Sequence, residues 1–255
     1  MNVRHVLAVL RFESVRSITP GRLLACALLM FFAPVLFAMI RNTANALSPA
    51  WWSVLLFFII PEVTCLLGLL LWASPILSSE LEGKTWLYLA VRPGGKAANL
   101  WGKYISAVIW TAMSAFVSLL FSLSLVDSDD IFRLLLTMSA LVVLSCLAYG
   151  ALFTLLGVVF QKRAMVVAVA YTILFEGIVS LIPAVINQLT VHYHLRGLLI
   201  HWMAINTAEL PLPKETLGNE PSWQHLCFLG GYTAVMLGVS YLCIHVNEYA
   251  TADET

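Results

Sequence analysis

Six long apolar runs constrain the fold of this chain more than any other feature of its sequence. A helix needs about 20 residues to cross the roughly 30 Å hydrocarbon core of a bilayer. No run shows the strict alternation of a barrel strand, and backbone groups in lipid must pair within the chain. The sequence therefore predicts an all-α integral membrane protein with six transmembrane helices, at about residues 23–40, 51–77, 101–126, 131–160, 165–186 and 223–246.

The composition agrees with a bilayer location. Hydrophobic residues make up 60% of the 255-residue chain, charged residues make up 11%, and the mean hydropathy is +0.89, outside the usual range of soluble domains. The five cysteines lie in apolar stretches without a CxxC pair, so neither a disulfide framework nor a thiolate metal site is indicated. No repeat or linker divides residues 1–255, which we interpret as one transmembrane domain that contacts membrane lipid and no nucleic acid.

The distribution of basic residues orients the chain. With the amino terminus in the cytoplasm, ten lysines and arginines fall inside, and only Arg41, Arg133, Arg196 and Lys214 fall outside. This asymmetry satisfies the positive-inside rule. It predicts a multi-pass protein of the cell inner (plasma) membrane with both termini in the cytoplasm.

The residues before the first run predict an amphipathic helix that lies along the inner leaflet. Val3, Leu7 and Leu10 share one face of this helix, whereas Arg4 and Arg11 share another. The sequence leaves two alternatives open. One is a disordered basic tail, and the other is a signal peptide cleaved near residues 44–46.

The segment 78–100 between the second and third runs contains the letters Gly83, Lys84 and Thr85, which end a nucleotide-binding loop of the form GxxxxGK[ST]. The position that needs the first glycine is Ser78, and the preceding residues end a membrane helix rather than a buried strand. The segment is also far too short for an ATPase domain. We therefore expect no nucleotide site here.

The same segment predicts a short cytoplasmic helix. Glu80 and Glu82 lie near its amino end, where the helix dipole favours acidic side chains. Trp86 and Leu87 belong to an apolar stretch that follows, and Pro93 begins a stop signal. An apolar helix on the cytoplasmic surface is typical of a docking element or of one that lies on the membrane.

The loop that these residues form resembles that of type-2 ABC exporter permeases. The matching pattern is Glu80-x-Glu82-x-x-Thr85, Pro93-x-x-Lys96 and Gly102-Lys103. Two departures affect the details of docking: the glycine is displaced by one position to Gly83, and Lys96 stands where the family usually has arginine. The expected topology, with an amphipathic first helix and six spans, is also similar.

The resemblance implies a non-enzymatic permease that pairs with a second permease copy and docks on a separate ABC ATPase subunit. The implied docking residues are Glu80, Glu82, Gly83, Thr85, Trp86, Leu87 and Pro93, with Lys162 and Arg163 as a second contact. ATP and Mg²⁺ would be bound by the partner subunit, so we expect no cofactor and no catalytic residue in this chain. An ordinary solvated loop is the alternative.

Glu62 and Glu176 are the only acidic residues deep within the predicted spans. An ionised carboxylate there costs several kcal/mol unless it is paired, so intramembrane acids suggest function. In the resembled family the second and fifth spans line the transport pathway, so we expect both residues to face it. Protonated glutamates bonded to neighbouring helices are the alternative. Pro61 and Gly177, beside the two acids, predict local bends.

The outer segment 187–222 contains His192, His194, His201 and Glu209. A His-x-His pair on an extended stretch points both rings one way, which would suit zinc or copper. The resemblance instead implies a re-entrant segment with interfacial histidines, and we expect no metal.

Two other function classes remain open. One is a membrane-embedded, metal-dependent enzyme that uses His192, His194 and Glu209. The other is a mechanical or regulatory ABC membrane partner that transports nothing. The substrate of a transporter is open as well, since two acids suit a hydrophobic cation whereas protonated acids suit a lipid or peptide.

Overall fold

The computed structural model describes residues 3–43, 49–126, 130–178, 185–204 and 220–247. These ranges consist of helices and turns, and no strand occurs in them. Five of the described helices are long and apolar enough to cross a membrane: Pro20–Asn42, Trp51–Trp72, Gly95–Leu123, Ile131–Val159 and Ser222–Val246. The protein is therefore an all-α, multi-pass membrane protein, as predicted.

The helices follow the chain in a simple order. The first two are α1 (Val3–Ser17) and α2 (Pro20–Thr43). The second span has three parts: α3 (Pro49–Phe57), the π-helical η1 (Phe58–Thr64) and α4 (Cys65–Trp72). Two short helices, α5 (Ser78–Glu82) and α6 (Trp86–Val91), precede α7 (Gly95–Leu123) and α8 (Ile131–Val159). The remaining elements are α9 (Ala164–Tyr171), the π-helical η2 (Thr172–Ile178), the 3-10 helix η4 (Val185–Leu189), α10 (Val191–Met203) and α11 (Ser222–Val246).

Several boundaries differ from the predicted ones. The run predicted at 165–186 is helical over Ala164–Ile178, which is shorter than 18 residues, and 179–184 lie outside the described ranges. The second span ends at Trp72 instead of residue 77. The third begins at Gly95 instead of residue 101. The residue before it, Gly94, has a left-handed backbone with a φ of 73°, and it ends the preceding turn. Gly102 and Lys103 therefore lie inside α7.

Helix α8 forms the centre of the bundle and packs against α4, α7, α10 and α11. Its side chains Met138, Tyr149 and Phe153 have no exposed surface. A Cβ atom at Gly157 would collide with the carbonyl oxygen of Ser74, so glycine permits close approach there. Close packing of this kind holds membrane helices together, because lipid supplies no hydrophobic driving force between them.

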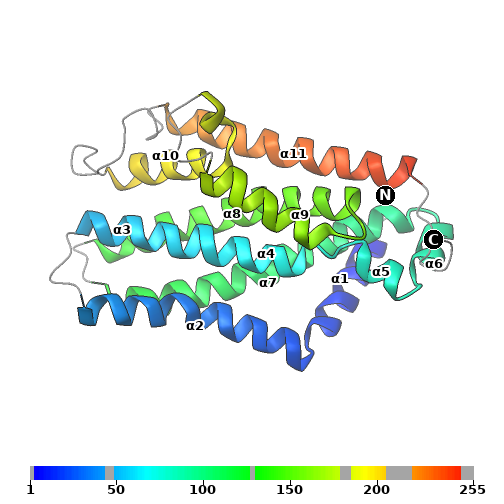
Figure 1. Ribbon diagram of the computed structural model, residues 1–255, viewed down its shortest axis with the longest axis horizontal. Coiled ribbons are helices and arrows are strands. Elements are labelled where there is room, and N and C mark those ends of the chain that lie inside the picture. Colours follow the sequence, from blue (N-terminus) through cyan, green and yellow to red (C-terminus); the bar gives the residue numbers. More distant parts are fainter. Residues whose placement is uncertain (1–2, 44–48, 127–129, 179–184, 205–219, 248–255) are drawn as a thin grey trace.

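The two ends of the bundle carry different elements (Figure 1). Helices α1, α5 and α6 lie at one end, together with the last turns of α11. The start of α3 and the helix α10 lie at the other end. The segment that resembles a docking loop is therefore at the same end of the bundle as α1.

Helix α1 forms where an amphipathic helix was predicted, and it packs on α7 with a face other than the one predicted to lie on the membrane. Val6, Glu13 and Ser17 are buried, whereas Leu7, on the predicted apolar face, is 56% exposed. A Cβ atom at Gly102 would lie 2.6 Å from Val9, so the two helices touch there. The exposed side of α1 carries further apolar residues, which suits contact with lipid.

Candidate functional site

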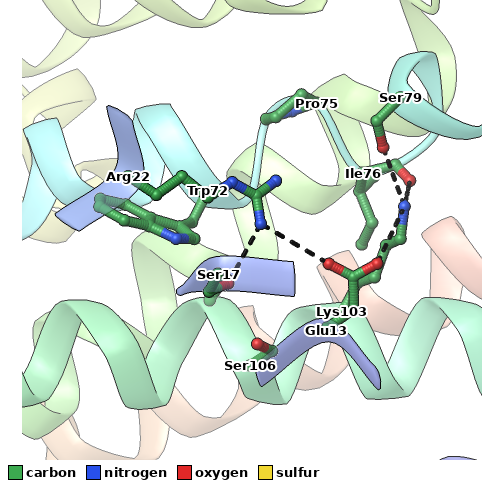
Figure 2. A pocket seen from close by; sticks show the side chains of 10 residues that line it. Glu13, Ser17, Arg22, Trp72, Pro75, Ile76, Ser79, Lys103 and Ser106 are labelled. Carbon is green, nitrogen blue, oxygen red and sulfur yellow. Dashed lines mark hydrogen bonds and ion pairs between the residues drawn. The ribbon is translucent and has the colours of Figure 1, made fainter. Parts of the chain in front are cut away.

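A buried cluster of charged side chains joins α1, α5 and α7. Lys103 of α7 lies 2.5 Å from Glu80 Oε1 and 3.8 Å from Glu13 Oε1. Its ammonium also donates to Ser79 Oγ at 2.9 Å and to the Ile76 carbonyl at 3.1 Å, as Figure 2 shows. Since the Lys103 and Glu80 side chains are each 6% exposed, this ion pair is largely shielded from water.

Two arginines surround the pair. Arg16 lies 3.3 Å from Glu80 and 3.5 Å from Glu13. Arg22 lies 3.9 Å from Glu13 and donates to Ser17 Oγ at 3.1 Å, which anchors the start of α2 (Figure 2). The adjoining cavity measures only about 20 Å³, room for about one water molecule. The cluster is thus an anchor between helices rather than a binding site.

The charge of Glu80 is stabilised inside this cluster. Burial raises the pKa of its carboxyl, but the positive charge of Lys103, the Lys103 and Thr85 hydrogen bonds and the charge of Arg16 outweigh it. The pKa of Glu80 is therefore lowered from its ordinary value. Thr85 Oγ1 donates to Oε2 of Glu80 and, at 3.3 Å, to the Glu80 carbonyl, so it holds the turn after α5.

The predicted single loop helix is two helices, because the chain turns at Gly83 and Lys84, where Lys84 has a φ of 54°. Trp86 is 3% exposed and joins an apolar cluster with Ile76, Leu77, Leu81, Leu100, Val158 and Ile244. The opposite side of α6 is open: Leu87 is 61%, Tyr88 74% and Val91 78% exposed. We call these three residues the loop face.

The residues predicted to dock on a partner thus fall into two groups. Glu80 and Trp86 are buried within the subunit, where they position the loop. Leu87 and the polar or turn residues Glu82, Gly83, Thr85 and Pro93 are exposed, as are Lys162 and Arg163. The Lys162 turn follows Val158, which belongs to the Trp86 cluster, so both predicted contact regions lie at one end of the bundle.

Glu62 and Glu176, predicted from separate spans, line the same cavity. Its volume is about 400 Å³, and its polar lining consists of Glu62, Tyr149, Thr172, Glu176 and His192. The remaining lining residues are apolar or glycine: Phe58, Val63, Leu66, Leu67, Ile173, Gly177 and Ile178. Glu62 is 5% and Glu176 8% exposed, so both acids are buried in mostly apolar walls.

Hydrogen bonds to Glu176 and a close contact of Glu62 with His192 connect the two acids. Glu176 Oε2 accepts from the Tyr149 hydroxyl at 3.0 Å and from the backbone N–H of His192 at 3.1 Å. Glu62 Oε1 lies against Nδ1 of the same histidine. The other ring nitrogen of His192 lies 3.3 Å from a guanidinium nitrogen of Arg196. His192 therefore bridges the second and fifth predicted spans.

Both acids stand on π-helical segments, η1 and η2. Pro61, which precedes Glu62, lacks a backbone N–H, and its carbonyl accepts a hydrogen bond from Ser145 of α8. Gly177 follows Glu176 in η2. Proline and glycine were predicted to bend these helices, and π-helical turns occur frequently at functional sites.

The outer histidines do not form the arrangement that a metal would need. His192 and His194 lie on the helix α10 instead of an extended stretch, and their rings face different partners. His194 Nδ1 lies 2.8 Å from Nδ1 of His225, and its ring stacks on Phe228. Within the described ranges, no group of three or more His, Cys, Asp or Glu side chains is placed to hold a metal ion. Glu209 lies outside these ranges.

No protein family model matches this chain, and no curated protein matches it closely enough to be called a relative.

Sequence reasoning missed three residues of these sites. Glu13 is the only acidic residue before Glu62, a signal that its charge has a partner. Tyr149 is a polar aromatic residue in the middle of a long apolar run. The sequence identifies Lys103 only within the Gly102-Lys103 pattern and does not reveal its ion pairs, because its partners Glu80 and Glu13 are distant in the sequence.

Proposed function

We propose that this chain is the permease subunit of an ABC-type exporter and that the loop face docks on a separate ATPase subunit. The single observation that carries the proposal is the loop itself. Its exposed residues Leu87, Tyr88 and Val91 lie at one end of the bundle. The buried residues Glu80 and Trp86 hold the loop against the bundle. Exposed apolar residues that are clustered on a short helix are typical of a site where another protein binds.

The anchor beneath the loop suits a force-transmitting role. Glu80 is paired with Lys103 of α7 and with Arg16 of α1. A displacement of the loop by the ATPase would therefore act on the third span and the amino-terminal helix together. Nucleotide binding by the partner could then shift the bundle between two states, provided that the partner binds one state better.

The proposal includes a membrane topology and a second copy. Six crossings require the segment that contains Ala164–Ile178 to be the fifth span. Both termini would lie in the cytoplasm of a cell whose inner or plasma membrane holds the protein. The exposed residues of η2, Ile173 at 58%, Leu174 at 53% and Phe175 at 44%, supply an apolar surface for a second permease copy.

Copurification tests the proposal with matched variants. Tagged protein extracted in mild detergent should bring down a protein with a complete P-loop, identified by mass spectrometry. Val91→Asp should abolish this association, whereas Val246→Asp should retain it. The two valines are both 78% exposed, and Val246 lies at the end of α11 rather than on the loop face. No ATPase in the wild-type eluate, or equal recovery with both variants, would refute the docking role.

A further inference from the structure

The cavity between η1, η2, α8 and α10 contains an imbalance of charge. Glu62 and Glu176 are both buried in it, and none of the described residues that line it carries a fixed positive charge. Buried carboxylates in apolar surroundings need a proton, a cation or several hydrogen-bond donors. The hydrogen-bond donors around each carboxylate therefore decide whether its charge is compensated.

The geometry assigns the protons of His192. A guanidinium only donates, so the 3.3 Å contact with Arg196 requires the Nε2 atom of His192 to be the acceptor. The remaining ring proton then sits on Nδ1 and points to Glu62 Oε1. His192 is thus neutral in this arrangement and lies against Glu62 without neutralising its charge.

The two acids differ in the number of polar groups that contact their carboxylates. Glu176 accepts from Tyr149 and from the first turn of α10, where the helix dipole also favours a negative charge. Glu62, which is 5% exposed, meets only the His192 ring among the polar side chains of the described residues. It lines a cavity of about 400 Å³, within the size range of small-molecule sites.

We propose that this cavity binds an organic monocation with an apolar body, such as an amine or onium compound, whose charged group lies between Glu62 and Glu176. The walls favour an organic cation over an inorganic one, because metal cations need several oxygen or nitrogen ligands. Within the described ranges no group of metal-binding side chains is present. Phe58 at 53%, Ile173 at 58% and Ile178 at 52% exposure border the cavity, so its entrance is apolar.

The proposal names the substrate class of the proposed exporter, and only the transport step rests on that function. Binding itself requires no ATPase. A chain that binds the cation but never associates with an ATPase would refute the exporter and leave the binding site standing.

Equilibrium binding to the purified, detergent-solubilised chain tests the proposal. The probes are radiolabelled tetraphenylphosphonium and tetraphenylborate, which share shape and size but carry opposite charges. A second groove of about 630 Å³ between α2 and α4 is lined only by apolar residues and would take either ion. Cation-selective binding therefore reports on the acid pair.

We expect saturable binding of the phosphonium and at least about tenfold weaker affinity in both Glu62→Gln and Glu176→Gln, since each loses a charge contact. Asp130→Asn removes an equal charge from the exposed start of α8 and should bind like the wild type. Equal binding of both ions, or unchanged affinity in either glutamate variant, would overturn the proposal.

Discussion

Lys103 Nζ of α7 lies 2.5 Å from Glu80 Oε1 of the loop, and both side chains are 6% exposed. One residue belongs to a membrane span and the other to the segment that faces the proposed partner. The pair therefore fastens the loop to the bundle. Removing one member of a buried ion pair leaves the other charge uncompensated, at about 3–5 kcal/mol.

This cost predicts the effect of Lys103→Met. The variant should be destabilised by about 3–5 kcal/mol, because Glu80 and Glu13 lose their nearest buried cation. Lys162→Met removes an exposed lysine at the same end of the bundle and should change stability by less than about 0.5 kcal/mol. Denaturant unfolding in detergent measures both. Similar values for the two variants would show that the cluster contributes nothing to stability.

Acid should weaken the attachment of the loop to the bundle, because it protonates the Glu80 carboxylate. Its pKa in the folded protein lies below the ordinary value of 4.5, because Lys103, Arg16 and Thr85 stabilise the carboxylate more than burial destabilises it. A lowered pKa contributes stability that is complete above the unfolded value and is lost as the pH falls through the folded value.

We therefore predict that the Glu80 carboxyl causes no change in protein stability near neutral pH. The stability should fall as the pH drops below about 4.5. Glu80→Gln should lack this part of the decline. Thermal unfolding midpoints recorded across that acid range compare the two proteins. Parallel pH profiles for the wild type and the variant would contradict the assignment.

The contact between α1 and α7 predicts opposite outcomes for two glycines. A Cβ atom at Gly102 would lie 2.6 Å from Val9, whereas nothing lies within 4 Å of a Cβ at Gly238. Gly102→Leu should therefore push α1 away and cost about 1–3 kcal/mol through overpacking. Gly238→Leu, on α11, should be tolerated.

Unfolding midpoints and the rate of protease cleavage within α1 measure the effect of these glycine variants. We expect faster cleavage of α1 in Gly102→Leu only. Equal cleavage rates would mean that α1 is not held by this contact.

The sequence predicts the fold class well, because apolar runs of bilayer length report directly on membrane helices. The run at 165–186 is the exception. Apolar composition does not reveal that the α-helix changes to a π-helix at Thr172. His192 and His194 were placed on an extended stretch, whereas Thr190 caps a helix there by accepting from the Tyr193 N–H.

The candidate sites were predictable only in part. Burial makes an intramembrane acid conspicuous, so Glu62 and Glu176 could be identified from their positions alone. Their shared bridge, His192, could not, because it depends on how α10 folds back onto the bundle. The sequence predicts a surface contact for Glu80 for the same reason: its partner Lys103 lies on the next span, and sequence spacing does not show that the two meet.

The central proposal is the contact between the loop face and an ATPase. A photo-crosslinking amino acid placed at Tyr88, which is 74% exposed, tests it in intact cells. The matched position is the 73% exposed Phe132 at the start of α8, next to Arg133, which donates to the Trp202 carbonyl of α10. We predict that the probe at position 88 crosslinks to a P-loop ATPase and that the probe at position 132 does not. An ATPase adduct from position 132 alone, or none from position 88, would contradict the account.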